Sequence, residues 1–145
     1  SELFSDEKEM LGKLKKAFLM VAGGAVQKYG PDLEGHQQLL IAAADILIEI
    51  YMAESTILRT EKMAKKDGES NVQEQIAMAK LYLYKAVDVV TQKGKESVIS
   101  FAEGDEQRMM LMGLRRFTKY TNMPNIIGLR EMITTKLVAE NEYCF

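Results

Sequence analysis

Residues that commonly perform chemistry are scarce in this chain of 145 residues, which has one histidine, one cysteine and no tryptophan. A nucleophilic cysteine needs a base and an electropositive setting. Cys144 instead stands next to last, between Tyr143 and Phe145, which is typical of an aromatic tail that docks on another surface. His36 falls in the first turn of the second predicted helix and is interpreted as an ordinary capping or surface side chain. No residue is therefore assigned a catalytic role.

Metal and cofactor sites have equally little support. A di-iron site in a helical bundle needs a Glu-x-x-His pair on each of two helices, and a single histidine excludes that pattern. Glu49, Glu54 and Glu61 are expected to form a solvated edge of the second helix. Gly23-Gly24 follows no strand, as a phosphate-binding loop would require, so it indicates a close helix contact or the last turn of a helix. We expect no metal and no cofactor to be held by this chain.

Two features of the fourth predicted helix could meet a partner. The first is a small basic group, which would suit a phosphate, an acidic lipid head group or an acidic protein, although a solvated helix face is favoured. It consists of Arg115, Arg116, Lys119 and Tyr120. The second is a cluster of methionines, which fill irregular core gaps and also line adaptable interfaces. We expect core, with an inter-domain surface as the second interpretation, for Met109, Met110 and Met112.

Composition bounds the class of protein. Apolar residues make up 47% and charged residues 28%, which is typical of a globular domain, and the length suits a single domain. A net charge of -2 and a pI near 5.5 argue against nucleic acid as a partner. No apolar run is long enough to span a bilayer. A single cysteine fits a reducing compartment, so the expected location is the cytoplasm. Because the chain begins at Ser1, we expect a piece of a larger protein.

Apolar residues recur at helical spacing in five segments. The first helix is predicted to open at Ser5, which would cap it, and a turn follows at residues 29–32. The second runs from about residue 34 to 65, with an apolar face so wide that a central place in a bundle is expected. The third begins at Ser70 or Asn71, and the fourth is expected to be capped by Asp105. A short fifth helix carries a stripe of Ile126, Leu129, Ile133 and Leu137.

The predicted core follows from these stripes. The first helix contributes Leu11, Leu14, Phe18, Val21, Ala22 and Ala25. The second contributes Leu39, Leu40, Ala43, Ile46, Leu47, Ile50, Ala53, Ile57 and Leu58. The third contributes Ile76, Ala79, Leu83, Ala86, Val87, Val90, Val98 and Phe101. Short loops force neighbouring helices to run in opposite directions. The predicted fold is therefore all-α: an antiparallel up-and-down four-helix bundle with an extra short C-terminal helix, forming one domain over residues 1–145.

Several segments together resemble the acyl-CoA dehydrogenases, and more narrowly the extra C-terminal helical region of the very-long-chain type. The similarity lies in helix order and apolar pattern and covers nearly the whole chain. Its segments are residues 38–51, 54–59 and 74–76 and the closing stretch 137–145, which is similar to the C-terminus of a bacterial member. The resemblance implies a flavoprotein parent that removes two hydrogens from an acyl-CoA thioester in fatty-acid beta-oxidation, with FAD taking a hydride and a glutamate taking a proton.

No residue of this chain matches the family's catalytic glutamate motif, so the resemblance places FAD and catalysis in a part of the parent upstream of Ser1. It implies a structural and oligomerisation role, with the catalytic domains of the parent chain as partner and a homodimer left open. The very-long-chain type is associated with membranes, but no strongly basic amphipathic helix supports peripheral membrane contact here. The alternatives are a freestanding helical protein-protein interaction module and a complete small enzyme, which the missing chemistry disfavours.

Overall fold

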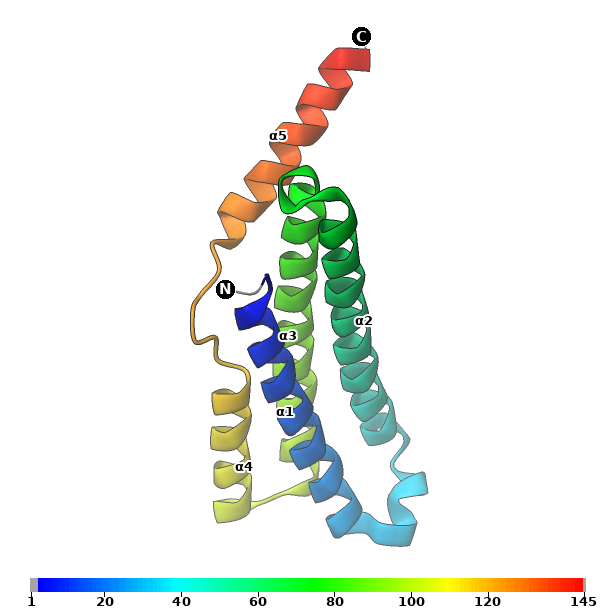
Figure 1. Cartoon of the computed structure of the whole chain (residues 1–145). Helices are drawn as coiled ribbons and strands as arrows, with labels where there is room; N and C mark the ends of the chain where they lie inside the picture. Colours follow the sequence, from blue (N-terminus) through cyan, green and yellow to red (C-terminus); the bar gives the residue numbers. More distant parts are fainter. Residues whose placement is uncertain (1–2, 145) are drawn as a thin grey trace.

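The computed structural model describes residues 3–144, with side chains described as far as residue 141. Figure 1 shows an all-helical chain, and the part described contains no β-strand. The elements are α1 (Ser5–Tyr29), η1 (Gly30–Gly35), α2 (Gln37–Asp67), η2 (Glu69–Asn71), α3 (Gln73–Phe101), α4 (Gly104–Phe117) and α5 (Ile126–Cys144). The predicted all-α class is confirmed.

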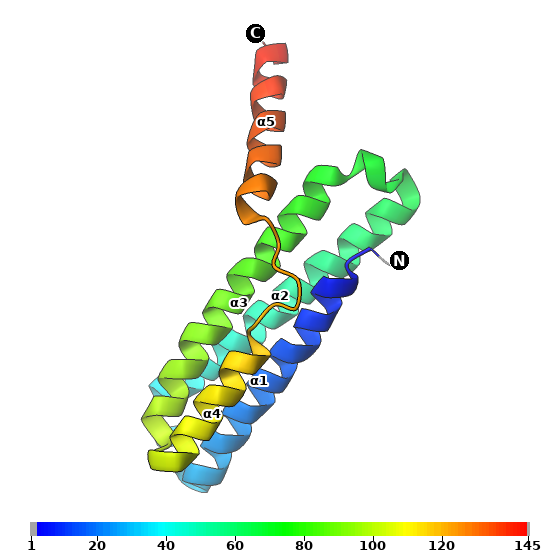
Figure 2. The same ribbon diagram turned by 90° about the vertical axis from the view of Figure 1, so that its left-hand side faces the viewer.

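Helices α1, α2 and α3 run side by side in alternating directions, and α4 packs against α1 and α3 (Figures 1 and 2). Because α4 has only 14 residues, it lies along one end of the bundle and leaves the other end three helices thick. Helix α5 then departs from the bundle axis and extends beyond it. The prediction of a short fifth helix is wrong, since α5 has 19 residues. After Gly128, no glycine or proline follows that would end it earlier.

Helix α3 lies at the centre of the core. It buries eleven residues, against seven for α2, and Leu83 and Val90 of α3 are at most 1% exposed. The predicted central place of α2 is therefore wrong. Its side chains Leu40, Leu47 and Leu58 are 39%, 50% and 47% exposed. Only one of the two apolar faces of α2 meets α1 and α3, and the other faces outward.

Buried apolar residues, rather than polar caps, precede two of the helices. Helix α1 does begin at Ser5 as predicted, but the residue before it is Phe4, which has φ 67° and is 3% exposed. Val72 holds the same position before α3 and is also 3% exposed. Neither residue makes a side-chain capping hydrogen bond, and none is found at the start of α4 either. The predicted caps by Ser5 and Asp105 are wrong. The residue before α1 is the packed Phe4, and the residue before α4 is Glu103 in extended backbone.

Glycines allow α4 to approach its neighbours closely. A Cβ atom added at Gly24 would lie 2.7 Å from the Cε atom of Met110 and from two ring carbons of Phe101. One added at Gly94 would lie 2.8 Å from the Cδ1 atom of Leu114. The close helix contact predicted for Gly23-Gly24 is confirmed at Gly24, whereas Gly23 faces open space.

The first half of α5 packs on α3. Ile126, Leu129 and Ile133 are half-buried, but Leu137 on the same stripe is 55% exposed because the bundle ends at that level. An ion pair of 2.5 Å joins the Nζ atom of Lys136 to Glu74 near the start of α3. The prediction that the bundle covers the α5 stripe therefore holds for three of its four residues.

Replacing Lys136 with alanine should raise the pKa of Glu74. The hydrogen bond from Lys136 is the largest cause of the lowered pKa of this carboxyl, which is ordinarily 4.5. The pair therefore stabilises the fold above that value, and its contribution fades as pH falls through the lowered pKa. NMR titration of the Glu74 carboxyl measures the change, with Lys85→Ala as a control that removes a lysine whose contacts are to Glu49 and the Tyr82 ring and not to Glu74. An unchanged Glu74 titration would mean that α5 does not dock on α3.

Candidate functional site

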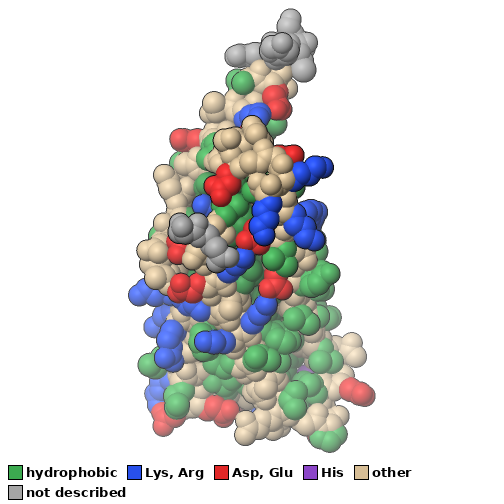
Figure 3. Space-filling view, in the orientation of Figure 1, with side chains coloured by type: hydrophobic (Ala, Val, Ile, Leu, Met, Phe, Trp, Pro, Cys, Tyr) green, Lys and Arg blue, Asp and Glu red, His purple; other side chains and the backbone are tan. Residues whose placement is uncertain are grey.

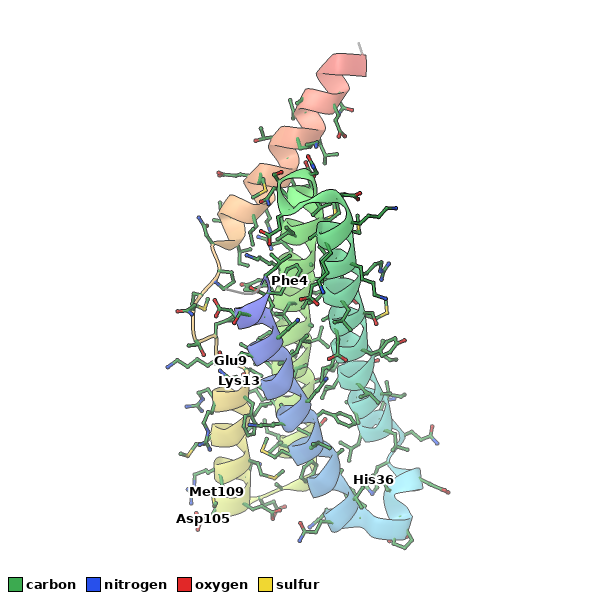
Figure 4. The ribbon with its side chains drawn as sticks, viewed as in Figure 1. Phe4, Glu9, Lys13, His36, Asp105 and Met109 are labelled. Carbon is green, nitrogen blue, oxygen red and sulfur yellow. The ribbon has the colours of Figure 1, made fainter. Side chains whose placement is uncertain are left out.

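The side chains singled out for chemistry lie apart from one another. His36 is exposed where α2 begins, and its ring stacks on Tyr29 with centroids 3.6 Å apart (Figure 4). Its position at the surface agrees with the sequence interpretation, although its side chain makes no capping hydrogen bond to α2. The side chain of Cys144 and the rest of the aromatic tail lie outside the described side chains.

The glutamates of α2 form ion pairs with neighbouring helices. Glu54 contacts Lys15 of α1 at 2.6 Å, and Glu61 contacts Lys8 of α1 at the same distance. Glu49 faces α3 instead, where its charge adds to burial in raising the pKa of Tyr82. The expectation of a solvated edge is wrong, because these positions lie at the seams where α2 meets its neighbours. Among described side chains, no three His, Cys, Asp or Glu groups gather closely enough to hold a metal ion.

The basic group at the end of α4 and just after it divides into two parts. Arg115, Arg116 and Lys119 are exposed, whereas Tyr120 turns inward. The Tyr120 hydroxyl is buried without a hydrogen-bond partner among the described residues. Burial raises its pKa above the ordinary range, and the carboxylates of Asp88 and Glu7 add to that effect. The favoured interpretation of a solvated helix face fits the three cations, and the tyrosine belongs to the packing between helices.

The methionine cluster also divides. Met110 packs against the core, as expected, but Met109 and Met112 are 71% and 64% exposed. Met109, labelled on α4 in Figure 4, borders an open groove of about 570 Å³ between α1 and α4. The groove is lined by Leu19, Met20, Gly23, Gly24, Gln27, Glu106, Met109 and Met110. For Met109 and Met112 the second interpretation, a surface that meets another domain, agrees better with their exposure.

A second apolar groove, of about 330 Å³, lies between α1 and α2. Its lining includes Phe18 and Leu19 from α1 and Leu47, Ile50 and Tyr51 from α2. Figure 3 shows apolar side chains gathered over this part of the surface. Leu19 and Tyr51 are each 67% exposed. Sequence reasoning missed this surface by treating the apolar residues of α2 as one wide face when they form two opposite ones.

The two apolar grooves offer few groups that could bind FAD. Its pyrophosphate needs convergent cations or backbone N–H groups. The two apolar grooves supply no cation apart from Lys15, which is paired with Glu54. A polar groove of about 180 Å³ between α2 and α3 is lined in part by Glu96 and Lys93. The Nζ atom of Lys93 lies 4.0 Å from a carboxylate oxygen of Asp45. The groove volume is below what cofactor pockets usually enclose.

None of the helices in the described range is both long enough and apolar enough to cross a membrane.

Comparison with known proteins identifies the family to which the chain belongs. The family described as "Acyl-CoA dehydrogenase, C-terminal domain" matches residues 13–116, and the chain belongs to that family. It is 36% identical over 121 residues to a probable acyl-CoA dehydrogenase of Bacillus subtilis (strain 168), a match that covers 83% of this chain. It is also similar to the crystal structure of acyl-CoA dehydrogenase complexed with FAD from Bacillus anthracis. That match has a TM-score of 0.89 and 34% identity over 97% of this chain.

The chain spans 20% of the length of the Bacillus subtilis relative and 24% of the Bacillus anthracis chain. Most of each relative therefore lies outside the matched region. The resemblance seen in the sequence is confirmed at the level of the family and of this domain.

Proposed function

We propose that this chain is the C-terminal helical domain of an FAD-dependent acyl-CoA dehydrogenase, with a structural role and no catalytic residue of its own. The observation that carries the proposal is the similarity of 97% of the chain, at a TM-score of 0.89, to one quarter of a structure described as an FAD complex. FAD and acyl-CoA would be bound by the remaining part of such an enzyme. The cytoplasm is the proposed location, which a single cysteine fits.

Its partner would be the flavin-binding part of the same enzyme. The exposed Met109 and Met112 and the apolar groove beside α4 support docking on another domain, because methionine adapts to irregular surfaces. Large exposed apolar patches are uncommon on proteins that act alone. The freestanding interaction module has no comparable support, since the relatives are much longer chains.

Flavin content and activity test this proposal. The gene is expressed with any coding sequence that precedes Ser1 in the same reading frame, and the product is compared with the 145-residue chain. The longer product should be yellow and should reduce an electron-accepting dye when acyl-CoA is added. The 145-residue chain should be colourless and inactive, because FAD and acyl-CoA would be bound by the remaining part of such an enzyme.

Two outcomes would contradict the proposal. Stoichiometric flavin or turnover in the 145-residue chain would support a complete small enzyme. A gene that encodes only this chain, or a longer product without flavin, would support the freestanding module.

A further inference from the structure

The second half of α5 projects beyond the bundle, and no described residue covers it (Figures 1 and 2). The first half packs on α3 through three half-buried residues of one stripe: Ile126, Leu129 and Ile133. The stripe continues to Leu137, which is 55% exposed, and Val138 beside it is 50% exposed. Every side chain from residue 134 to residue 141 is exposed. The apolar stripe of α5 therefore runs past the end of the surface that covers it.

The projecting half of α5 is poorly stabilised by its own sequence. A short stretch of helix without tertiary contacts is marginal in water. Basic residues near the C-terminal end of a helix stabilise it, but the last turn of α5 has none. Glu140 instead places a carboxylate near the negative end of the helix dipole, and Lys136, one turn earlier, pairs with Glu74. The surface that would best complete this half is an apolar patch edged by lysine or arginine.

The start of α1 lies beside the linker that leads into α5. Two hydrogen bonds join them: the Thr121 hydroxyl donates to Glu9 at 2.8 Å, and the side-chain amide of Asn122 donates to Asp6 at 3.4 Å. A polypeptide segment that precedes α1 would therefore emerge next to the linker that carries α5. This placement favours a preceding part of the same chain as the covering surface, because covalent linkage gives it a high effective concentration.

The projecting helix has a counterpart in a longer relative. The match to the Bacillus anthracis structure covers 97% of this chain at a TM-score of 0.89, so it includes most of the 19 residues of α5. The matched region is 24% of that relative. The relative thus keeps this helix in a chain that offers much more polypeptide to pack against it.

We propose that residues 134–141 of α5 dock on the part of the enzyme that precedes this domain, with Leu137 and Val138 as anchors in an apolar patch edged by basic side chains. The inference rests on the proposed function, which supplies that preceding part, and it adds the element and the chemistry of the contact. This surface is distinct from the groove beside Met109, which lies at the other end of the bundle (Figure 4).

Hydrogen exchange tests whether the projecting half is covered. The 145-residue chain and the longer product, which includes the coding sequence before Ser1, are compared by hydrogen-deuterium exchange with mass spectrometry. Backbone amides of residues 134–141 should exchange at least roughly tenfold more slowly in the longer product, because in the isolated domain this half opens locally.

Leu137→Glu tests the apolar anchor. In the longer product it should abolish the added protection of residues 134–141 and lower the melting temperature by at least about 2 °C. The 145-residue chain should melt unchanged, because Leu137 is already 55% exposed there. Ala139→Glu is the matched control. It adds the same charge at an exposed position that lies nearly opposite Leu137 at about 100° per residue, and it should change neither measurement.

Glu140→Lys tests the charge of the partner surface. A lysine suits the negative end of the helix dipole, so the melting temperature of the 145-residue chain should stay the same or rise. In the longer product the same change sets a cation against the basic edge of the patch and should lower both the melting temperature and the protection of α5. A fall in the 145-residue chain, or none in the longer product, would contradict the basic edge.

Flavin content separates this inference from the proposed function. A longer product that is yellow and active overturns the α5 contact alone if residues 134–141 exchange as fast as in the 145-residue chain, or if Leu137→Glu and Ala139→Glu behave alike. A longer product without flavin overturns the enzyme assignment alone if α5 is protected, and both if it is not. A gene that encodes only this chain overturns both. Protection that grows with the concentration of the 145-residue chain would assign the contact to a second copy and overturn the inference.

Discussion

Replacing Leu83 with alanine should lower the free energy of unfolding by about 2–5 kcal/mol, the range for leucine-to-alanine changes in packed cores. Leu83 is 1% exposed on α3, the helix that contacts α1, α2, α4 and α5. The cavity would open at the helix that all the other bundle helices contact. Chemical denaturation followed by circular dichroism measures the loss.

Met78→Ala on the same helix is the matched control. Met78 is 52% exposed, so its truncation should change the free energy of unfolding by no more than about 0.5 kcal/mol. A loss at Leu83 no greater than at Met78 would mean that α3 is not the centre of the core.

The helices themselves could be predicted from the sequence because helical spacing is a local property. The predicted start of α1 at Ser5 agrees with the structure, and α5 contains the predicted stripe that begins with Ile126. The caps could not be predicted, because residues such as Phe4 are buried by contacts that the local sequence does not contain. A serine at a helix start indicates a cap only when the preceding residue has no better packing partner.

The central helix could not be identified from pattern alone. A helix with one wide apolar face and a helix with two opposite apolar faces have similar composition. Distinguishing them requires knowing which elements are near, and α2 packs against α1 and α3 on one side only. The same limit applies to Glu54 and Glu61, whose ion pairs depend on α1 lying alongside α2.

The candidate site shows a further limit of sequence reasoning. The composition, with one histidine and one cysteine, predicts a role for the protein surface rather than for a catalytic site. Which surfaces are open depends on exposure: Met110 packs inward while Met109, one residue earlier, is 71% exposed. Adjacent residues on one helix thus have different roles that only the packed structure distinguishes.

Gly24→Ala should destabilise the protein by about 1–2 kcal/mol, although alanine is the better helix former by about 1 kcal/mol. The added methyl group would lie 2.7 Å from the Phe101 ring and from the end of Met110. Met110 can turn aside, but the ring of Phe101 is only 3% exposed and has no space to move. Overpacking of this kind costs about 1–3 kcal/mol and should outweigh the gain in helix propensity.

Gly23→Ala separates the two effects. Gly23 lies one residue earlier on α1 with no atom near its added Cβ, so only the helix preference acts there. This variant should be more stable than the parent by about 0.5–1 kcal/mol, and thermal melts of both variants should move in opposite directions. The pair isolates the contact of α1 with Phe101 and α4 from the intrinsic behaviour of the helix. If both substitutions stabilise the chain, α4 does not pack against α1 as closely as the geometry of Gly24 requires.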